Sequence, residues 1–324
     1  MLDEASFAIG LSMLRSVTTV ALMTMLASAG AQARTLEVGQ GKQYPAPSAA
    51  VAVAQEGDTI AIYPGQYFDC AVITENKLTI EGIGNADQIV MTDKACEGKA
   101  LLVIRGENVT VRNITLTRVR VAEENGAGIR GESKSILIDK VRFINNQNGI
   151  LSGTEGGSMT IMNSVFEKNG FCGGACSHGV YVGHLDLVHI ENTRFFDTKQ
   201  AHHIKSRAAR TEVVGCDIQD GPGGTASYEI EAPNGGSVIV RDSTIVKGPK
   251  AENHTAAIMI GSEGVTQTTP EIIVENNTFR NDGSYPTIFV DNLTATEAQV
   301  IGNKISGSGP VRPLKGDGKV VASK

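Results

Sequence analysis

Most of this chain repeats one spacing of apolar residues: a β-branched residue is followed, five positions later, by Phe or another large apolar residue. The repeated pairs are Val111 and Leu116, Ile138 and Phe143, Ile161 and Phe166, Ile190 and Phe195, Val213 and Ile218, Val240 and Ile245, Val274 and Phe279, and Val300 and Ile305. Successive pairs begin 23 to 34 residues apart. Repetition at such a period is typical of a stacked architecture, in which equivalent positions of successive units lie one above another.

A second apolar series accompanies the first, at Ile129, Ile150, Val180, Ile204, Ile230, Ile258 and Ile288. The segments around both series are short and β-branched, and their spacing is not that of a helix. Three short strands in each unit predict an all-β, right-handed parallel β-helix with coils about 4.8 Å apart. The alternative is a two-sheet β-sandwich, whose strands would alternate more strictly and would not keep a coil-length period.

Asn or Asp stands two residues after the leading residue in five units, at Asn113, Asn163, Asn192, Asp242 and Asn276. These residue types tolerate left-handed backbone and bond to their own chain, so they mark corners between strands. Stacked on successive turns, they are expected to form an amide ladder inside the stack. The residue five beyond the leader then faces inward on the next strand, which explains the column of Phe.

The beginning of the domain predicts a cap. Pro45–Gln55 is a short, Ala-rich amphipathic segment, and a helix covering the first coil is expected because an open strand edge would promote aggregation. The next segment, Gly57–Tyr67 (GDTIAIYPGQY), and the later KLTIEGIG resemble the entry to the first coils of the pectate-lyase-like superfamily. The resemblance implies a β-helix over residues 34–308, with residues 309–324 as a tail or as a cap on the last coil.

The N-terminus predicts export. Arg15 precedes the apolar run Val17–Ala27, and a small-x-small motif ends at Ala33, so residues 1–33 are expected to be a cleaved signal peptide. Two acidic residues near the start do not suit a basic n-region, and translation is therefore expected to begin at Met13 or to include an unusual extension. The alternative is a membrane anchor, but the run is short for a spanning helix. The predicted location is periplasmic or secreted.

The five cysteines agree with export. Cys70 and Cys96 lie about one coil apart, and Cys172 and Cys176 enclose three residues, so two disulfides are expected. Cys216 falls inside a predicted strand and is expected to be a small core residue.

Composition narrows the class of partner. The chain has no Trp, few aromatic residues and 37 Gly, which suits short strands separated by tight corners. Its formal net charge of −6 argues against a general polyanion-binding face and against nucleic acid as a partner. A monomer is expected.

The residues that flank the second apolar series predict a functional face, because neighbours of an inward-facing strand residue point outward. The middle of this face is polar, and Met259 and Phe289 predict that its C-terminal end is apolar. The polar residues are Tyr181, His203, Lys205, Glu229 and Glu231.

Loop lengths indicate the same region. Long connections are expected at Glu167–Gly179, Gln219–Glu229 and Val246–Ala257, with a shorter one at Phe196–His203. Long loops on both sides of a short one predict a notch over His202–Arg207, and loops on a rigid scaffold are the usual carriers of function.

The residues over this notch suit removal of the proton alpha to the carboxylate of a uronic acid, which needs a base, an acid and a group that stabilises the enolate-like intermediate. Lys205 is the candidate base or charge stabiliser, with an ammonium pKa lowered by its surroundings. The candidate proton shuttles are His202, His203 and Tyr181. The candidate groups for substrate carboxylates are Arg207, Arg210 and His178. The candidate Ca²⁺ ligands are Glu229, Glu231 and Asn234. A zinc site of Cys172, Cys176 and His178 is an alternative.

The segment HHIKSRAARTEVVGC resembles the catalytic-lysine coil of the β-helix alginate and chondroitin lyases, with Lys205-Ser206 at the position of their lysine. Those enzymes have two calcium-binding glutamates just upstream, where this chain has Thr198 and Gln200. Their arginine of the next coil falls near Ala226–Tyr228 here. The resemblance therefore implies a role for Lys205 alone.

These observations predict an exported protein that acts on an acidic polysaccharide by β-elimination or C5 epimerisation. One alternative is a polysaccharide-binding or cell-envelope scaffold without catalysis, in which Tyr181 stacks on a sugar and Lys205 and Glu231 form a surface ion pair. The other is a glycoside hydrolase, for which Glu229 with Glu231 or Asp217 with Asp220 are the possible carboxylate pairs. The chain lacks the Asp cluster and the Gly-His-Gly of the β-helix pectin hydrolases.

Overall fold

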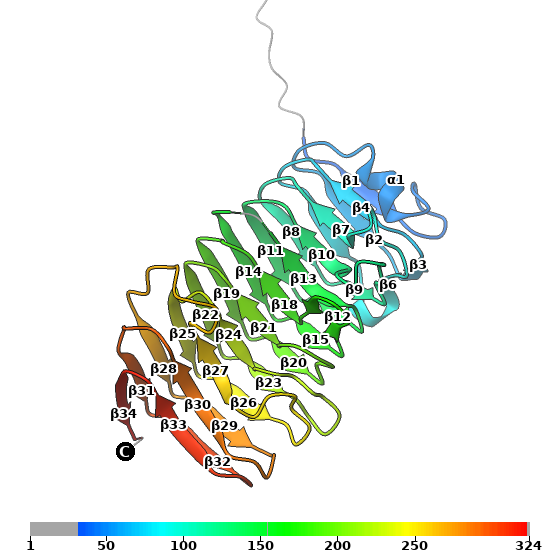
Figure 1. Ribbon diagram of the computed structural model, residues 1–324. Helices are drawn as coiled ribbons and strands as arrows, with labels where there is room; N and C mark the ends of the chain where they lie inside the picture. Colours follow the sequence, from blue (N-terminus) through cyan, green and yellow to red (C-terminus); the bar gives the residue numbers. More distant parts are fainter. Residues whose placement is uncertain (1–31, 154, 323–324) are drawn as a thin grey trace, which may run out of the picture. The chain divides into compact units, whose positions relative to one another are not determined.

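The computed structural model describes residues 32–153 and 155–322, and over these residues the chain winds through short strands that stack into three parallel sheets (Figure 1). Each full coil contributes one strand to sheet A, one to sheet B and one to sheet C, in that order. This is the predicted parallel β-helix, and the β-sandwich alternative is wrong.

The pairing within each sheet joins a strand to its equivalents in the coils before and after. Among the described residues, sheet A has twelve strands: β1 (Thr35–Val38), β2 (Thr59–Ile62), β5 (Thr79–Gly82), β8 (Val109–Arg112), β11 (Ser135–Asp139), β14 (Ser158–Met162), β19 (Leu187–Glu191), β22 (Arg210–Val214), β25 (Ser237–Arg241), β28 (Ile272–Glu275), β31 (Ala298–Ile301) and β34 (Gly318–Val321).

Sheets B and C each have ten strands in the same part of the chain. Sheet B contains β3 (Gly65–Tyr67), β6 (Ile89–Thr92), β9 (Thr115–Thr117), β12 (Arg142–Ile144), β15 (Val165–Glu167), β20 (Arg194–Phe196), β23 (Asp217–Gln219), β26 (Thr244–Lys247), β29 (Thr278–Asn281) and β32 (Lys304–Gly307). Sheet C contains β4 (Ala71–Ile73), β7 (Ala100–Ile104), β10 (Ala127–Gly131), β13 (Asn148–Ser152), β18 (Val180–Val182), β21 (Ile204–Ser206), β24 (Ile230–Ala232), β27 (Ala256–Ile260), β30 (Thr287–Asn292) and β33 (Val311–Lys315).

The two apolar series form the core between the sheets, and their members are buried in columns. Phe143, Phe166 and Phe195 stack in sheet B with ring centroids 4.5 Å and 4.7 Å apart, close to the spacing of parallel strands.

One member of the second apolar series is out of register. Val290, not Ile288, pairs with Ile258, so Phe289 is buried against Phe279, and Asp291 follows Met259 on the outer face. The prediction that Phe289 lies on the outer face was therefore wrong.

The corner residues have the expected backbone but a different role. Asn113, Asn163, Asn192, Asp242 and Asn276 all have φ between 48° and 57°, and this left-handed corner turns their side chains toward the surface. The ladder inside the stack is instead made one residue later. There, a side-chain oxygen accepts the N–H of the equivalent residue in the preceding coil, as for Ser164 to Val141, Thr193 to Ser164, Ser243 to Cys216, Asn277 to Ser243 and Asn303 to Asn277.

Both expected disulfides are present, Cys70–Cys96 and Cys172–Cys176. The second closes a small hairpin of β16 (Phe171–Cys172) and β17 (Cys176–Ser177). Cys216 is buried as expected, and burial raises the pKa of its thiol to about 11. The zinc alternative is wrong, because Cys172 and Cys176 are joined to each other and are not thiolates.

The ends of the β-helix differ from the expected boundaries. Helix α1 (Pro47–Val51) packs against β1, β2 and β4, and is shorter than the predicted segment. A 3₁₀ turn, η1 (Ala86–Gln88), precedes β6. At the other end, β33 and β34 continue the sheets, so residues 309–321 extend the β-helix and are not a tail. The predicted signal peptide lies almost entirely outside the described residues. Among those that are described, no helix is long and apolar enough to cross a membrane.

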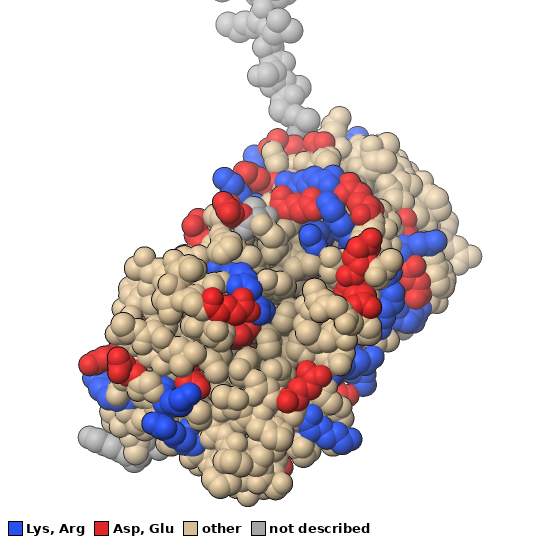
Figure 2. All heavy atoms as spheres, viewed as in Figure 1, with Lys and Arg blue, Asp and Glu red and all other residues tan. Residues whose placement is uncertain are grey.

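Charged side chains on the surface pair between neighbouring coils. Examples are Arg112 with Glu81 at 2.8 Å and Arg118 with Asp93 at 2.6 Å. Figure 2 shows the result on one face, where Lys and Arg lie beside Asp and Glu in small mixed groups. Exposed pairs of this kind each stabilise the fold by roughly 0–1 kcal/mol, so the apolar columns and backbone ladders dominate.

The Phe column provides a test of this ranking. We expect Phe166→Ala to lower the free energy of unfolding by about 3–5 kcal/mol, because it removes a ring packed between two others. Phe68→Ala is the matched control, since the Phe68 side chain is 60% exposed, and should change stability little. Urea unfolding of both variants measures the difference. Equal losses would contradict the assignment of stability to this column.

Candidate active site

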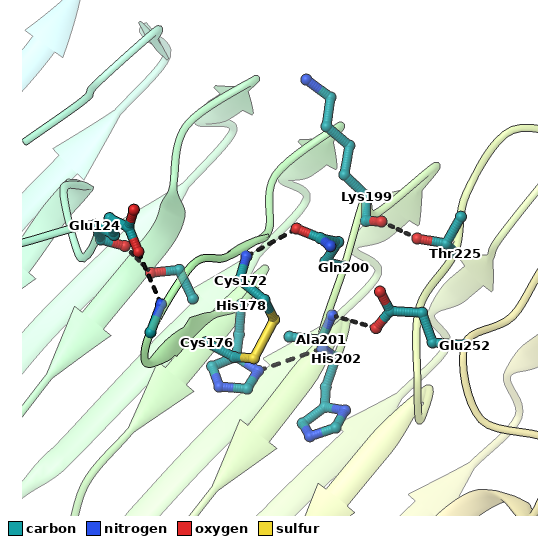
Figure 3. Close-up of a disulfide and its surroundings, with 12 residues drawn as sticks. Glu124, Cys172, Cys176, His178, Lys199, Gln200, Ala201, His202, Thr225 and Glu252 are labelled. Atoms are coloured by element: carbon teal, nitrogen blue, oxygen red, sulfur yellow. Dashed lines mark hydrogen bonds between the residues drawn. A yellow bond between two sulfur atoms is a disulfide. The ribbon is translucent and has the colours of Figure 1, made fainter.

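A cleft of about 370 Å³ lies at the start of the strands in the middle of sheet C. Its walls come from the disulfide-closed hairpin, from the turn before β21 and from the loops before β24 and β27. The lining residues are Ala175, Cys176, His178, Tyr181, Ala201, His202, Lys205, Ser227 and Glu252. Figure 3 shows the disulfide beside His178 and His202, with Glu252 reaching toward Ala201. The predicted notch over His202–Arg207 is therefore present.

The register of sheet C places three predicted residues in one column. Tyr181 pairs with Lys205, and Lys205 pairs with Glu231, so the three side chains leave adjacent coils on the same side. Lys205 Nζ lies 2.9 Å from Glu231 Oε2. Both side chains are buried, which separates this contact from an ordinary surface ion pair. Ser262 Oγ donates a hydrogen bond of 2.7 Å to Glu231 Oε1.

Arg207 lies beside the cleft, next to two of the residues just described. Its Nε donates to Tyr181 Oη at 2.9 Å, and its Nη1 donates to Asn234 Oδ1. Glu263, on the loop between β27 and β28, contacts both cations: one carboxylate oxygen lies 2.6 Å from Lys205 Nζ, and the other lies 2.5 Å from Arg207 Nη2. A single carboxylate is thus held between a lysine and an arginine, beside a tyrosine hydroxyl.

The charges in the cleft follow from these contacts. Burial opposes the charge of Lys205, but Glu231 and Glu263 outweigh it and raise its pKa above the ordinary value. The pKa of Glu231 is lowered despite burial, because His202, Lys205 and Ser262 stabilise the carboxylate. Lys205 is therefore a charged ammonium, and its pKa is raised where the sequence predicted a lowered one. Its role as a charge stabiliser stays a prediction.

Two histidines stack along the edge of the cleft and continue onto Tyr228. The ring centroids of His178 and His202 are 4.8 Å apart, and those of His202 and Tyr228 are 5.2 Å apart. Burial, His202 and Lys205 hold the pKa of His178 well below its ordinary value, so its imidazole is neutral.

Each Nδ1 accepts a backbone N–H from the next coil, His178 from residue 202 at 3.3 Å and His202 from residue 228 at 3.2 Å. These contacts place the ring proton on Nε2 in both histidines. His202 Nε2 lies 3.1 Å from Glu231 Oε2, and His178 lines the cleft.

His203 and Glu229 are not in the cleft. Each lies at the corner just before its strand, β21 or β24, where side chains do not alternate between the two faces of the sheet. Both side chains are fully buried. His203 contacts Thr198 at 2.7 Å and Asp220 at 3.1 Å, whereas Glu229 lies 3.6 Å from the buried Lys247. Burial raises the pKa of Glu229 well above its ordinary value, although Lys247 opposes the shift. These residues form an internal polar cluster.

Arg210 and the three predicted Ca²⁺ ligands have different surroundings from those expected. Arg210 begins β22 in sheet A and pairs with Glu212 and Glu271, so it does not line the cleft. Glu229, Glu231 and Asn234 do not converge, because each is engaged by a different partner. Within residues 32–153 and 155–322, no three His, Cys, Asp or Glu side chains are grouped to hold a metal ion.

The hydrolase pairs also fail to converge. Asp217 faces Arg194 on sheet B at 3.3 Å, while Asp220 is buried and accepts backbone N–H groups from residues 226 and 248. Glu229 is internal and pairs with Lys247, whereas Glu231 is buried against Lys205. Neither pair presents two carboxylates across a common opening.

Sequence reasoning missed Glu263, Ser262 and Tyr228. Tyr228 occupies the same position in its coil as His178 and His202, so the aromatic types at this position were a readable signal. Glu263 had no signal beyond the length of its loop, residues 261–271, which follows a strand of sheet C.

The fold and the cleft define a parallel β-helix protein with a charged site on one sheet. A family model described as "Right handed beta helix region" matches residues 155–321, slightly more than half of the chain. The chain therefore belongs to the right-handed β-helix family, and the resemblance to the pectate-lyase-like superfamily is confirmed for the fold. No curated protein matches the chain.

Solved structures with a similar fold include an alginate lyase from Paenibacillus sp. str. FPU-7. It is 17% identical, with a TM-score of 0.58, over 88% of this chain and 99% of that chain. The A-module of the mannuronan C-5 epimerase AlgE6 from Azotobacter vinelandii is 16% identical, with a TM-score of 0.42, over 86% of this chain and 94% of that module. At 17% identity, the likeness to the alginate lyase shows the fold alone.

The lowered pKa of Glu231 predicts a pH-dependent contribution to stability. At neutral pH we expect Glu231→Gln to reduce the free energy of unfolding by about 1–3 kcal/mol, because Lys205 and His202 lose a charged partner. A carboxyl with a depressed pKa stabilises the fold above its ordinary value of 4.5 and loses this effect as pH falls. The difference between wild type and variant should therefore shrink below pH 4.5.

Urea unfolding at neutral pH and at a series of acidic pH values measures this dependence. Glu75→Gln, at an exposed position, is the control and should differ little from wild type at any pH. A difference for Glu231→Gln that is constant with pH would contradict the proposed charge pairing.

Proposed function

We propose that this protein acts on an acidic, uronate-containing polysaccharide by removing the C5 proton, which leads to β-elimination or to C5 epimerisation. One observation carries the proposal: Lys205, which lines the cleft, and Arg207 beside it together hold a carboxylate, that of Glu263, next to the hydroxyl of Tyr181. The similarity to an alginate lyase supports the fold only, so the proposal rests on this arrangement.

The proposed first step is exchange of carboxylates. The uronate carboxylate replaces that of Glu263 on Lys205 and Arg207, and two cations then neutralise the charge that develops when C5 loses its proton. Such pairing lowers the barrier most in a site that excludes water, and both Lys205 and Glu231 are buried. Glu231 holds the ammonium in place from the opposite side.

Tyr181 is the proposed group for proton transfer. Its oxygen accepts a hydrogen bond from Arg207 Nε, and Lys205 Nζ lies 5.9 Å from the ring centroid, so a phenolate at this position has two cationic neighbours. The Nε2–H of neutral His178 is the proposed hydrogen-bond donor toward the glycosidic oxygen, and the proton that this oxygen gains is the one that Tyr181 took from C5. Elimination needs this donor, whereas epimerisation returns a proton to the other face of C5.

Export belongs to the same proposal. Two disulfides support an oxidising compartment, and residues 1–33 have the pattern of a signal peptide. A periplasmic or secreted monomer is the expected form. A scaffold that binds polysaccharide without changing it is the second candidate, favoured by the stack of His178, His202 and Tyr228, which suits sugar rings.

Variants of the cleft test catalysis directly. We expect Tyr181→Phe, which keeps the ring and removes only the hydroxyl, to lower kcat by roughly 10²–10⁴-fold on any uronate polymer that the wild type converts. Lys205→Ala should abolish conversion, and Lys134→Ala, at an exposed position, is the matched control. Elimination is measured by ultraviolet absorbance of the unsaturated sugar end, and epimerisation by deuterium uptake at C5.

Full activity of Tyr181→Phe or Lys205→Ala would contradict the mechanism. Binding of a uronate polymer by the wild type without either chemical change would instead establish the scaffold function.

Glu263 is expected to compete with substrate. Removal of its carboxylate in Glu263→Ala frees Lys205 and Arg207, and we expect KM to fall by roughly two- to fivefold, as an exposed ion pair contributes about 0.2–1 kcal/mol. Steady-state kinetics with a uronate polymer measures this change. Glu271→Ala is the control, because Glu271 pairs with Arg210 outside the cleft. A rise in KM for Glu263→Ala would show that Glu263 helps to bind substrate.

A further inference from the structure

A second concavity, of about 560 Å³, lies along the same edge of sheet C as the cleft. It is formed where the chain enters β27, β30 and β33. Its lining residues are His254, Thr255, Pro286, Thr287, Ile288, Pro310, Val311 and Arg312. Nothing in the proposed chemistry uses these residues.

The strand register makes this concavity a continuation of the cleft. Ala256, Ile288 and Arg312 pair in one column, two residues before the inward-facing residues Ile258, Val290 and Leu314. His178, His202 and Tyr228 occupy the same position in the preceding coils, two residues before Val180, Ile204 and Ile230, which pair in turn with Ile258. From His202 to Arg312 there are four coil steps, or about 19 Å at the spacing of parallel strands.

One loop borders both hollows. Glu252, on the connection between β26 and β27, lines the cleft, and His254 and Thr255 of the same connection line the second concavity. A ligand that lies along this edge can therefore contact the two hollows in succession.

The second concavity has a flat aromatic platform. The ring of His254 stacks on Tyr285, with centroids 3.6 Å apart and planes within 3° of parallel. Tyr285 is fixed from below by its hydroxyl, which donates to the carbonyl of Gly248 at 2.5 Å. His254 is exposed, so the outer face of its ring is open to a ligand. Apolar surface from Pro286, Pro310 and Val311 surrounds the platform, a combination that suits the C–H face of a sugar ring.

Arg312 supplies the charge. Its Nε donates to the carbonyl of Leu314 at 2.8 Å, which anchors the guanidinium at the rim. In the part of the chain that the structure describes, no carboxylate lies within ion-pair distance of Arg312, whereas Lys205 and Arg207 are both paired with Glu263. An unpaired guanidinium beside an apolar platform is complementary to a sugar that carries a carboxylate.

We propose that this second concavity is a distal subsite for the same polysaccharide chain, in which a uronate ring packs on His254 and its carboxylate binds Arg312. The inference rests on the proposed function, because it assigns the ligand of the cleft to the neighbouring hollow. The separation of about 19 Å between His202 and Arg312 exceeds the reach of one sugar, so only an oligomer engages both places. The subsite makes affinity depend on chain length.

Isothermal titration calorimetry with a graded series of oligouronates, from the dimer upward, tests the subsite. We expect the wild-type Kd to fall once the oligomer is long enough to reach Arg312. Arg312→Ala and His254→Ala should each weaken binding of the long oligomers by roughly three- to tenfold and leave the short ones unchanged. Both side chains are exposed, so the variants should keep the wild-type thermal unfolding temperature. Arg194→Ala, on sheet B, is the matched control.

Three outcomes would overturn the inference. If both variants bind long oligomers as tightly as wild type while Tyr181→Phe remains inactive, the distal subsite is wrong and the proposed function stands. If short and long oligomers lose affinity equally, the residues act on the fold and form no subsite. If no uronate oligomer binds to or is changed by the wild type, the proposed function fails and the subsite fails with it.

Discussion

In-register pairing between parallel strands of neighbouring coils is the constraint on which the rest of this molecule depends. Backbone hydrogen bonds of the three sheets hold each residue over its equivalent in the next coil, so side chains of one type collect in columns. The same rule produces the stack of Phe143, Phe166 and Phe195, the hydroxyl and amide ladder after the corners, and the column of Tyr181, Lys205 and Glu231. The candidate cleft lies where such columns contain a different polar residue in each of a few neighbouring coils, as in the column of Tyr181, Lys205 and Glu231.

Strand β21 (Ile204–Ser206) and the corner before it separate two groups of charged residues. On the outer side, Glu231 stabilises Lys205 and contacts His202, and the loop residue Glu263 joins Lys205 to Arg207. On the inner side, His203, Asp220, Glu229 and Lys247 are buried together. Adjacent residues therefore serve opposite environments, because the corner before each sheet C strand directs one side chain out and the next one in. The outer system is open to ligand, and the inner one belongs to the core.

The sequence predicted where the candidate cleft lies, but placed only some of its residues correctly. Tyr181, Lys205 and Glu231 follow from strand alternation, which holds inside a strand. His203 and Glu229 lie at corners, where backbone geometry and not alternation directs the side chain, and both were assigned to the wrong side. The Asn residues were placed correctly at corners, but a positive φ turns their side chains outward. The hydrogen-bond ladder inside the stack is therefore made by the residue that follows each of them. Glu263 depends on the path of a loop, which no periodicity describes.

The sequence by itself determined the coil period, the β-helix, the two disulfides and the face on which charged residues gather, because each of these follows from spacing along the chain. The tertiary structure alone decided which charges meet. A difference of two residues in register moved Phe289 into the core and Asp291 into the outward-facing column, where it is buried 2.9 Å from Lys315. A loop of sheet C brought Glu263 onto Lys205 and Arg207. Contacts between side chains depend on angstrom-scale distances at corners and loops, and the repeat pattern contains no information at that scale.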